Sequence, residues 1–156
     1  MMLHKKKWKK LSNLLNLLSQ KGSDYLNAIE KIMSEYDEFN YIFHQNMPKK
    51  MHGLIDGTTI YINDRISDKQ KVSAIMEEVG HYKTSSHSDI TDYKINAKDE
   101  AVARRWSYGQ LIPVDHIARY QDREDAVLVY EIAEDLELPE AIVESAIYMY
   151  KVKGMI

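Results

Sequence analysis

The chain has 156 residues, of which 44% are hydrophobic and 29% are charged, and it contains no cysteine. This length suits one domain that buries its own core without covalent cross-links. The lack of cysteine excludes a disulfide framework, a thiolate zinc cluster, an iron–sulfur site and a cysteine nucleophile. Any metal site must therefore use histidine and carboxylate side chains.

The formal net charge of −3 is unevenly distributed along the chain. Residues 1–21 carry six lysines and no acidic residue, which leaves a net charge of −9 for the remaining 135 residues. Residues 114–150 alone hold ten acidic residues against two arginines. Non-specific nucleic-acid binding depends on the neutralisation of phosphates by clustered Lys and Arg, so we expect no direct nucleic-acid binding by the acidic body of the protein.

The N-terminal residues superficially resemble a signal peptide, because lysines precede the leucine-rich residues 11–18. Polar residues interrupt the leucines and no small-residue cleavage site follows. No apolar run approaches the roughly 20 residues that span a bilayer, so we expect a cytoplasmic protein without a membrane span. The leucines share one helical face, which predicts a helix that packs on the body or on a partner. A helix that lies on a membrane surface is the alternative.

The first half of the chain predicts a helical extension followed by a small sheet. Residues 24–36 have apolar side chains at helical spacing, and we expect residues 1–36 to form a helical N-terminal extension. Residues 41–44 and 54–63 predict three short strands. Asp56-Gly57 suits the tight turn with positive φ that joins the last two strands into a hairpin.

The second half predicts helices only. Ser67 suits the N-cap of the first, and Pro113 ends or re-aims the second; the predicted ranges are 67–82, 95–111, 114–120, 123–136 and 139–151. The sequence therefore predicts an α+β fold. We expect residues 37–156 to form a mostly helical domain with a helical C-terminal part over residues 114–153, and the chain to be a single compact domain overall.

The segment Glu77-Glu78-Val79-Gly80-His81 carries the most chemical information. Glu77 and His81 are four residues apart in the first of these helices, so their side chains share one face and can grip one ion. Glu78 lies about 100° further around the helix, where its carboxylate can reach a water on that ion. This is the geometry of the His-Glu-x-x-His helix of zinc peptidases, with Glu77 in place of the first histidine. Solvated helices also produce this pattern by chance.

A third carboxylate stands on the next predicted helix, where Glu100 follows His81 by nineteen residues. A catalytic zinc site takes three protein ligands and keeps a fourth position open. A carboxylate from a following helix would complete such a ligand set.

Together these segments resemble the ImmA/IrrE family of metallopeptidases, in particular the members carried by phages and integrative elements of Gram-positive bacteria. The resemblance covers about residues 37–153 and rests on four segments: Glu78-Val79-Gly80-His81, Glu100-Ala101-Val102-Ala103, Trp106, and Leu111-Ile112-Pro113. It implies a zincin-like fold in which His81 and Glu100 bind zinc and Glu78 is the general base. Glu77 occupies the first ligand position and is the departure from the strict family pattern.

The activity that the resemblance implies is that of a zinc-dependent endopeptidase. Zinc lowers the pKa of its bound water toward roughly 7, and Glu78 accepts a proton from that water and passes it to the leaving amine. Tyr82, His87 and Tyr108 are candidates for the donor to the tetrahedral oxyanion or for substrate contacts. Two carboxylates and one imidazole leave a zinc site near neutral charge. Weaker binding, or a preference for manganese or another oxygen-preferring ion, is therefore an alternative.

Five other residues have interpretations outside the ligand set. His87 could replace the missing histidine ligand, but a solvated loop histidine is the simpler reading. His52 flanks the predicted hairpin and could line a substrate groove, as could His44. Arg104 and its neighbour Arg105 predict a solvated helix face that can pair with acidic groups.

Residues 131–143 predict two helices joined by a turn, a shape shared with DNA-binding motifs. A DNA-reading helix places basic or amide side chains at its start, whereas this one offers Glu140 and Glu144. We expect a protein-docking surface or plain helical packing here instead of DNA binding.

The resemblance also implies a partner. The substrate would be a DNA-binding repressor of a mobile genetic element such as a prophage, which the protein cleaves or inactivates. The acidic residues 114–150 could dock a basic repressor. The alternative is a non-catalytic anti-repressor that retains the zincin-like fold, because Glu77 replaces the first histidine.

Overall fold

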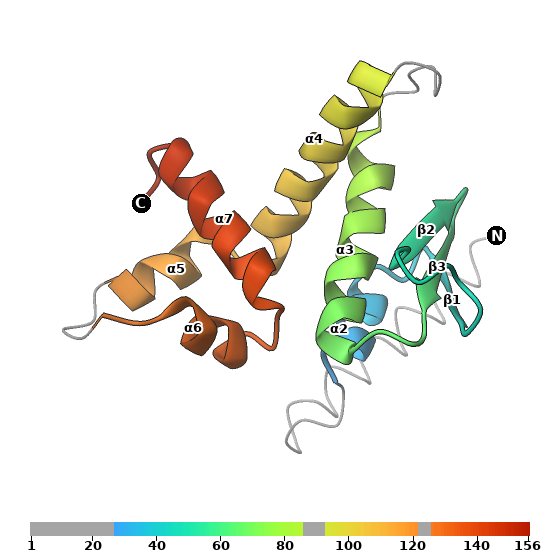
Figure 1. Cartoon of the computed structure of the whole chain (residues 1–156), viewed down its shortest axis with the longest axis horizontal. Helices are drawn as coiled ribbons and strands as arrows, with labels where there is room; N and C mark the ends of the chain where they lie inside the picture. The colour runs from blue at the N-terminus through green and yellow to red at the C-terminus, as the bar shows by residue number, and fades with distance from the viewer. Residues whose placement is uncertain (1–26, 86–92, 122–125) are drawn as a thin grey trace, which may run out of the picture. The chain divides into compact units, whose positions relative to one another are not determined.

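The computed structural model describes residues 27–85, 93–121 and 126–156 (Figure 1). The chain divides into two compact units, residues 1–37 and residues 38–156. The predicted leucine-rich helix over residues 11–18 lies outside the described residues.

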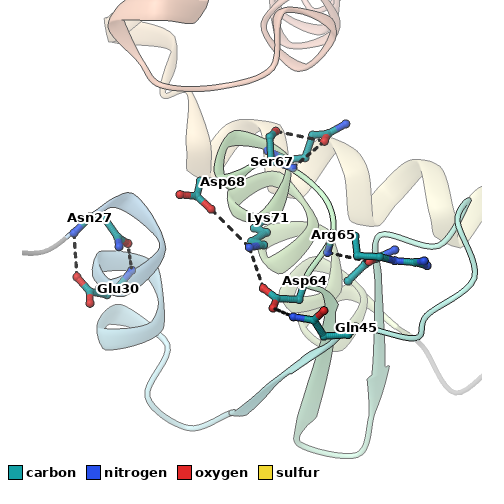
Figure 2. A network of polar contacts seen from close by, with 10 residues as sticks. Asn27, Glu30, Gln45, Asp64, Arg65, Ser67, Asp68 and Lys71 are labelled. Carbon is teal, nitrogen blue, oxygen red and sulfur yellow. Dashed lines mark hydrogen bonds and ion pairs between the residues drawn. The ribbon is translucent and has the colours of Figure 1, made fainter.

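The first unit contains helix α2, Ala28–Glu35. Asn27 caps this helix: its side chain accepts a hydrogen bond of 3.0 Å from the backbone N–H of Glu30. The Glu30 carboxylate in turn accepts one of 3.0 Å from the backbone N–H of Asn27 (Figure 2). This capping box satisfies two backbone donors and explains why the helix begins at Ala28, within the predicted range 24–36.

The second unit opens with a three-stranded sheet of β1 (Asn40–His44), β2 (Gly53–Asp56) and β3 (Thr59–Asn63), in the order β1-β3-β2. β3 is central, parallel to β1 and antiparallel to β2. Gly57 has a φ of 57°, so the predicted tight turn between β2 and β3 is confirmed. The order of the strands leaves β2 at one edge of the sheet.

Among the described residues of the second unit, five helices follow: α3 (Asp68–Thr84), α4 (Tyr93–Leu111), α5 (Val114–Gln121), α6 (Val129–Asp135) and α7 (Glu140–Val152). The predicted α+β class is confirmed, with the strands before the main helices. Across the described ranges of the chain, no helix combines the length and the apolar character that crossing a membrane requires.

The start of α6 differs from the prediction of a helix over residues 123–136. Residues 126–128 are not helical, and α6 begins only at Val129. The Glu131 carboxylate accepts a hydrogen bond of 2.8 Å from the backbone N–H of Leu128, which fixes the first turn at this point. Helix-forming composition alone does not show such a local cap.

A polar network joins the sheet to the start of α3 (Figure 2). The Lys71 ammonium lies 2.9 Å from a carboxylate oxygen of Asp64 and 3.5 Å from one of Asp68. Asp64 also accepts a hydrogen bond of 2.8 Å from the Gln45 side chain, just after β1. The predicted N-cap is confirmed, because the Ser67 side chain accepts a hydrogen bond from the backbone of Gln70. These contacts tie the start of α3 to the segments that follow β1 and β3.

The core of the second unit lies between the sheet, α3, α4 and α7. β3 contributes Ile60 and Ile62, which are completely buried. The buried face of α3 consists of Val72, Ala74, Ile75, Met76, Val79 and Gly80. On the other side of α4, the Tyr150 hydroxyl of α7 donates a hydrogen bond of 2.6 Å to the backbone carbonyl of Ile112. The packing therefore holds α3 and α4 side by side between two supporting layers.

Candidate metal centre

Three side chains that can bind a metal converge where α3 and α4 face each other. Glu77, His81 and Glu100 each offer one ligand atom, and these atoms all lie within 4.8 Å of one another. Glu77 and His81 stand one turn apart on α3, and Glu100 comes from α4. The predicted ligand set is therefore brought together in space.

The spacing of these atoms is compatible with a single ion. Two ligand atoms that are each about 2.1 Å from a tetrahedral zinc ion lie about 3.4 Å apart. His81 Nε2 and Glu100 Oε1 are 3.5 Å apart. A separation of 4.8 Å would have to shorten, and the Glu77 and Glu100 side chains, 33% and 47% exposed, have room for such an adjustment. The imidazole and carboxylates present thus fit a zinc ion or a harder divalent ion.

Close packing of the helix backbones supports this convergence. Gly80 precedes His81 and faces α4: a β-carbon placed on it would lie 2.6 Å from the backbone carbonyl oxygen of Ala103. No side chain larger than hydrogen fits at this contact without a shift of one helix. The absence of a side chain at Gly80 is thus what lets α4 bring Glu100 within reach of His81.

Glu78 lies beside the three candidate ligands and against strand β2. Burial, and to a lesser extent the nearby charges of Glu77 and Glu100, raise the pKa of its carboxyl to about 7, although a hydrogen bond with the backbone of Ile55 lowers it. A β-carbon on Gly53 would lie 3.0 Å from both Cγ and Oε1 of Glu78. A carboxyl with a pKa near neutrality, held in a fixed place, is suited to accept and return a proton.

Arg104 is the fourth charged group of this cluster. Its Nε lies 2.9 Å from Glu77 Oε1, and one of its terminal nitrogens lies 3.5 Å from Glu100 Oε2. The hydrogen bond to Glu77, and to a lesser extent the charges of Glu77 and Glu100, raise the pKa of the guanidinium. The sequence predicted a solvated arginine face that pairs with acids, but the particular partners of Arg104 depend on how α3 and α4 pack.

The cluster lines a cleft of about 740 Å³. One wall is β2 and the residues before it, including His52, Gly53 and Leu54; the other is formed by α3 and α4. Because β2 is an edge strand, the cleft runs beside backbone groups that face away from the rest of the sheet. The volume is in the range of ordinary ligand sites.

The structure places the other predicted site residues elsewhere. Tyr82 is 47% exposed and contacts Phe39 edge to face, with ring centroids 4.9 Å apart. Tyr108 lines a second depression, of about 490 Å³, between α4 and α7. Neither tyrosine is among the described residues that line the cleft. His87 lies outside the described residues.

Comparison of the chain with known protein families, with characterised proteins and with solved structures gives no match.

Proposed function

We propose that this protein is a zinc-dependent endopeptidase of the ImmA/IrrE type with a zincin-like fold, which cleaves or inactivates a repressor of a mobile genetic element. The observation that carries this proposal is the convergence of Glu77, His81 and Glu100 within 4.8 Å beside the partly buried Glu78. The sequence resemblance supplies the reaction and the substrate class.

The roles of the chain's own residues follow from their positions. Glu77, His81 and Glu100 would hold the ion, which when bound activates water and polarises the scissile carbonyl. Glu78 would accept a proton on its carboxylate and return it to the leaving amine, a role that suits a pKa of about 7. The edge of β2 could hold an extended peptide along the cleft through backbone hydrogen bonds.

The acidic C-terminal helices support a basic protein as partner. The exposed acids from α6 to the start of α7, including the turn between them, are Glu131, Glu134, Asp135, Glu137 and Glu140. Such a surface attracts basic proteins and speeds their association at low salt. A DNA-binding repressor is a basic protein of this kind.

One experiment tests the proposed activity. The purified protein and its Glu78→Gln variant are analysed for bound zinc and mixed with the repressor encoded next to the gene. We expect both to bind zinc and only the unsubstituted protein to cleave the repressor. Glu144→Gln, the same change on α7 in the second depression, is the matched control and should cleave normally.

A non-catalytic anti-repressor is the second candidate. It is favoured by Arg104, a cation of the chain itself that already contacts both Glu77 and Glu100. In that case repressor inactivation would persist in Glu78→Gln, and no new fragments would appear in mass spectra of the mixture.

A further inference from the structure

The cation that joins the candidate ligands belongs to the chain. Arg104 stands one turn after Glu100 on α4 and reaches across to Glu77 on α3. Its contacts use Oε1 of Glu77 and Oε2 of Glu100, whereas Oε1 of Glu100 is the atom 3.5 Å from His81. The two oxygens of Glu100 thus face different partners, and Arg104 lies on the side away from the imidazole.

This arrangement has a consequence for charge. With histidine at position 77, a site with one carboxylate and two imidazoles would carry one negative charge, whereas Glu77 adds a second. The guanidinium of Arg104 balances the charge of Glu77, and their 2.9 Å separation is within the usual range of a charge-assisted hydrogen bond. Glu77 together with Arg104 has the same net charge as a neutral histidine ligand.

Arg104 also acts on geometry. Glu77 and Glu100 are like charges on neighbouring helices and repel each other when nothing lies between them. A planar guanidinium with several donors can contact both carboxylates at once, which a lysine ammonium does less well. Hydrogen bonds to the outer atoms of ligating groups orient those groups, and their loss typically lowers metal affinity about 10- to 100-fold.

We propose that Arg104 is the positioning residue that allows a carboxylate to stand at position 77: it holds Glu77 and Glu100 for the metal and offsets the charge that Glu77 adds. This inference rests on the proposed function, because it assumes that these residues bind a divalent ion. The repulsion between Arg104 and that ion is the opposing effect. Water weakens this repulsion, because the arginine side chain is 53% exposed.

The test is a set of zinc titrations on the full chain, with a chromophoric chelator as competitor. We expect Arg104→Gln to bind zinc at least 10-fold more weakly than the unsubstituted protein. Arg104→Lys keeps the positive charge but lacks the planar guanidinium with its several donors, so its zinc affinity should lie between those of Arg104→Gln and the unsubstituted protein. Arg105→Gln removes the same charge from the next position of α4, which lines the second depression, and should leave zinc affinity unchanged.

The same substitution in the Glu77→His variant tests whether Arg104 acts through Glu77. In Glu77→His the guanidinium has no carboxylate at position 77 to balance, so adding Arg104→Gln should leave zinc affinity unchanged or increase it. An equal loss from Arg104→Gln in both backgrounds would overturn the inference, and so would zinc affinity in Arg104→Gln equal to or tighter than that of the unsubstituted protein.

Failure of the proposed function has a different signature. If the unsubstituted protein binds no zinc, cobalt or manganese, the metal centre itself is wrong. The contact between Glu77 and Arg104 is then measured by urea unfolding of Glu77→Gln, Arg104→Gln and the double variant in the presence of chelator. Non-additive losses would keep Arg104 as the partner that positions Glu77. Additive losses would overturn that role as well.

Discussion

Gly80 of α3 and Ala103 of α4 touch through their backbones, since a β-carbon on Gly80 would lie 2.6 Å from the Ala103 carbonyl oxygen. The contacting atom belongs to the backbone of the completely buried Ala103, so this contact cannot be relieved by moving a flexible side chain. The distance between the helices that carry His81 and Glu100 is therefore set by a position where only glycine fits.

Gly80→Ala should destabilise the protein and weaken the metal centre together. Overpacking in a core costs about 1–3 kcal/mol, more than the roughly 1 kcal/mol that alanine gains over glycine inside a helix. Urea unfolding and zinc titration measure the two effects. Gly109→Ala is the matched control in α4, because the nearest atom to its new β-carbon, the Tyr150 hydroxyl, is 4.0 Å away. That variant should be as stable as the unsubstituted protein or more so; equal behaviour of the two variants would contradict the role of Gly80.

Gly53→Ala should act on Glu78 with little effect on stability. The new β-carbon would lie 3.0 Å from Cγ and Oε1 of Glu78, and the carboxyl, at the end of a side chain with three rotatable bonds, can turn away. We expect slower cleavage of the repressor, by about 10-fold or more since a small misplacement of a catalytic group is costly. Zinc affinity should be retained. Unchanged cleavage at full stability would show that the place of Glu78 against β2 does not matter for the reaction.

Glu78 should make the stability of the protein in chelator depend on pH. Its pKa is about 7 in the folded chain, against an ordinary value of 4.5 for an exposed glutamate, so the unfolded chain loses this proton first as the pH rises. Stability from this group is therefore lost as the pH rises from 4.5 to 7, by about 3 kcal/mol, because one pKa unit corresponds to about 1.4 kcal/mol. Glu78→Gln removes this loss. Urea unfolding at pH 4.5 and pH 8 should show a gain of stability for the variant relative to the unsubstituted protein only at the higher pH.

Lys71 should stabilise the junction of the sheet with α3 over a broad pH range. Its hydrogen bond lowers the pKa of Asp64, and Asp64 in turn raises the pKa of Lys71. The stabilisation from Asp64 is present above its unfolded pKa, near 3.8, and is lost as the pH falls through the lower folded value. That from Lys71 is present below its unfolded pKa, near 10.5, and is lost as the pH rises through the higher folded value.

Lys71→Met should accordingly lower the midpoint of urea unfolding at pH 7. The difference in midpoint between the variant and the unsubstituted protein should be smaller at pH 2. Lys69→Met, which breaks the more exposed pair of Lys69 with Glu134, is the matched control and should have the smaller effect. The same loss from both variants would show that the network around Asp64 adds no more than a surface ion pair.

Local signals in the sequence predict the elements that position the site. Asp56-Gly57 encodes its own turn, and Ser67 encodes the start of α3, because each acts on backbone groups a few residues away. The spacing of Glu77 and His81 likewise predicts their shared face, since one turn of helix decides it.

Contacts between distant elements were not predictable in the same way. β1 pairs in parallel with β3, although β2 lies between them in the sequence. Nothing in Asn40–His44 specifies which strand β1 pairs with or in which direction. Arg104 reads as one of two exposed arginines, and only the crossing of α3 over α4 distinguishes it from Arg105. Local composition also misplaced the start of α6, where the cap at Leu128 decides the boundary.

The four residues that make up the candidate centre and its arginine lie within residues 77–104, on two consecutive helices. Any cation that bridges Glu77 and Glu100 closes a short loop of chain, and closing a short loop costs little entropy. A cation at the centre should therefore stabilise the contact between α3 and α4. Loss of the cation should let α3 and α4 open locally, which would be measured as faster amide hydrogen exchange in both helices. The amides of α6 and α7 should keep their protection.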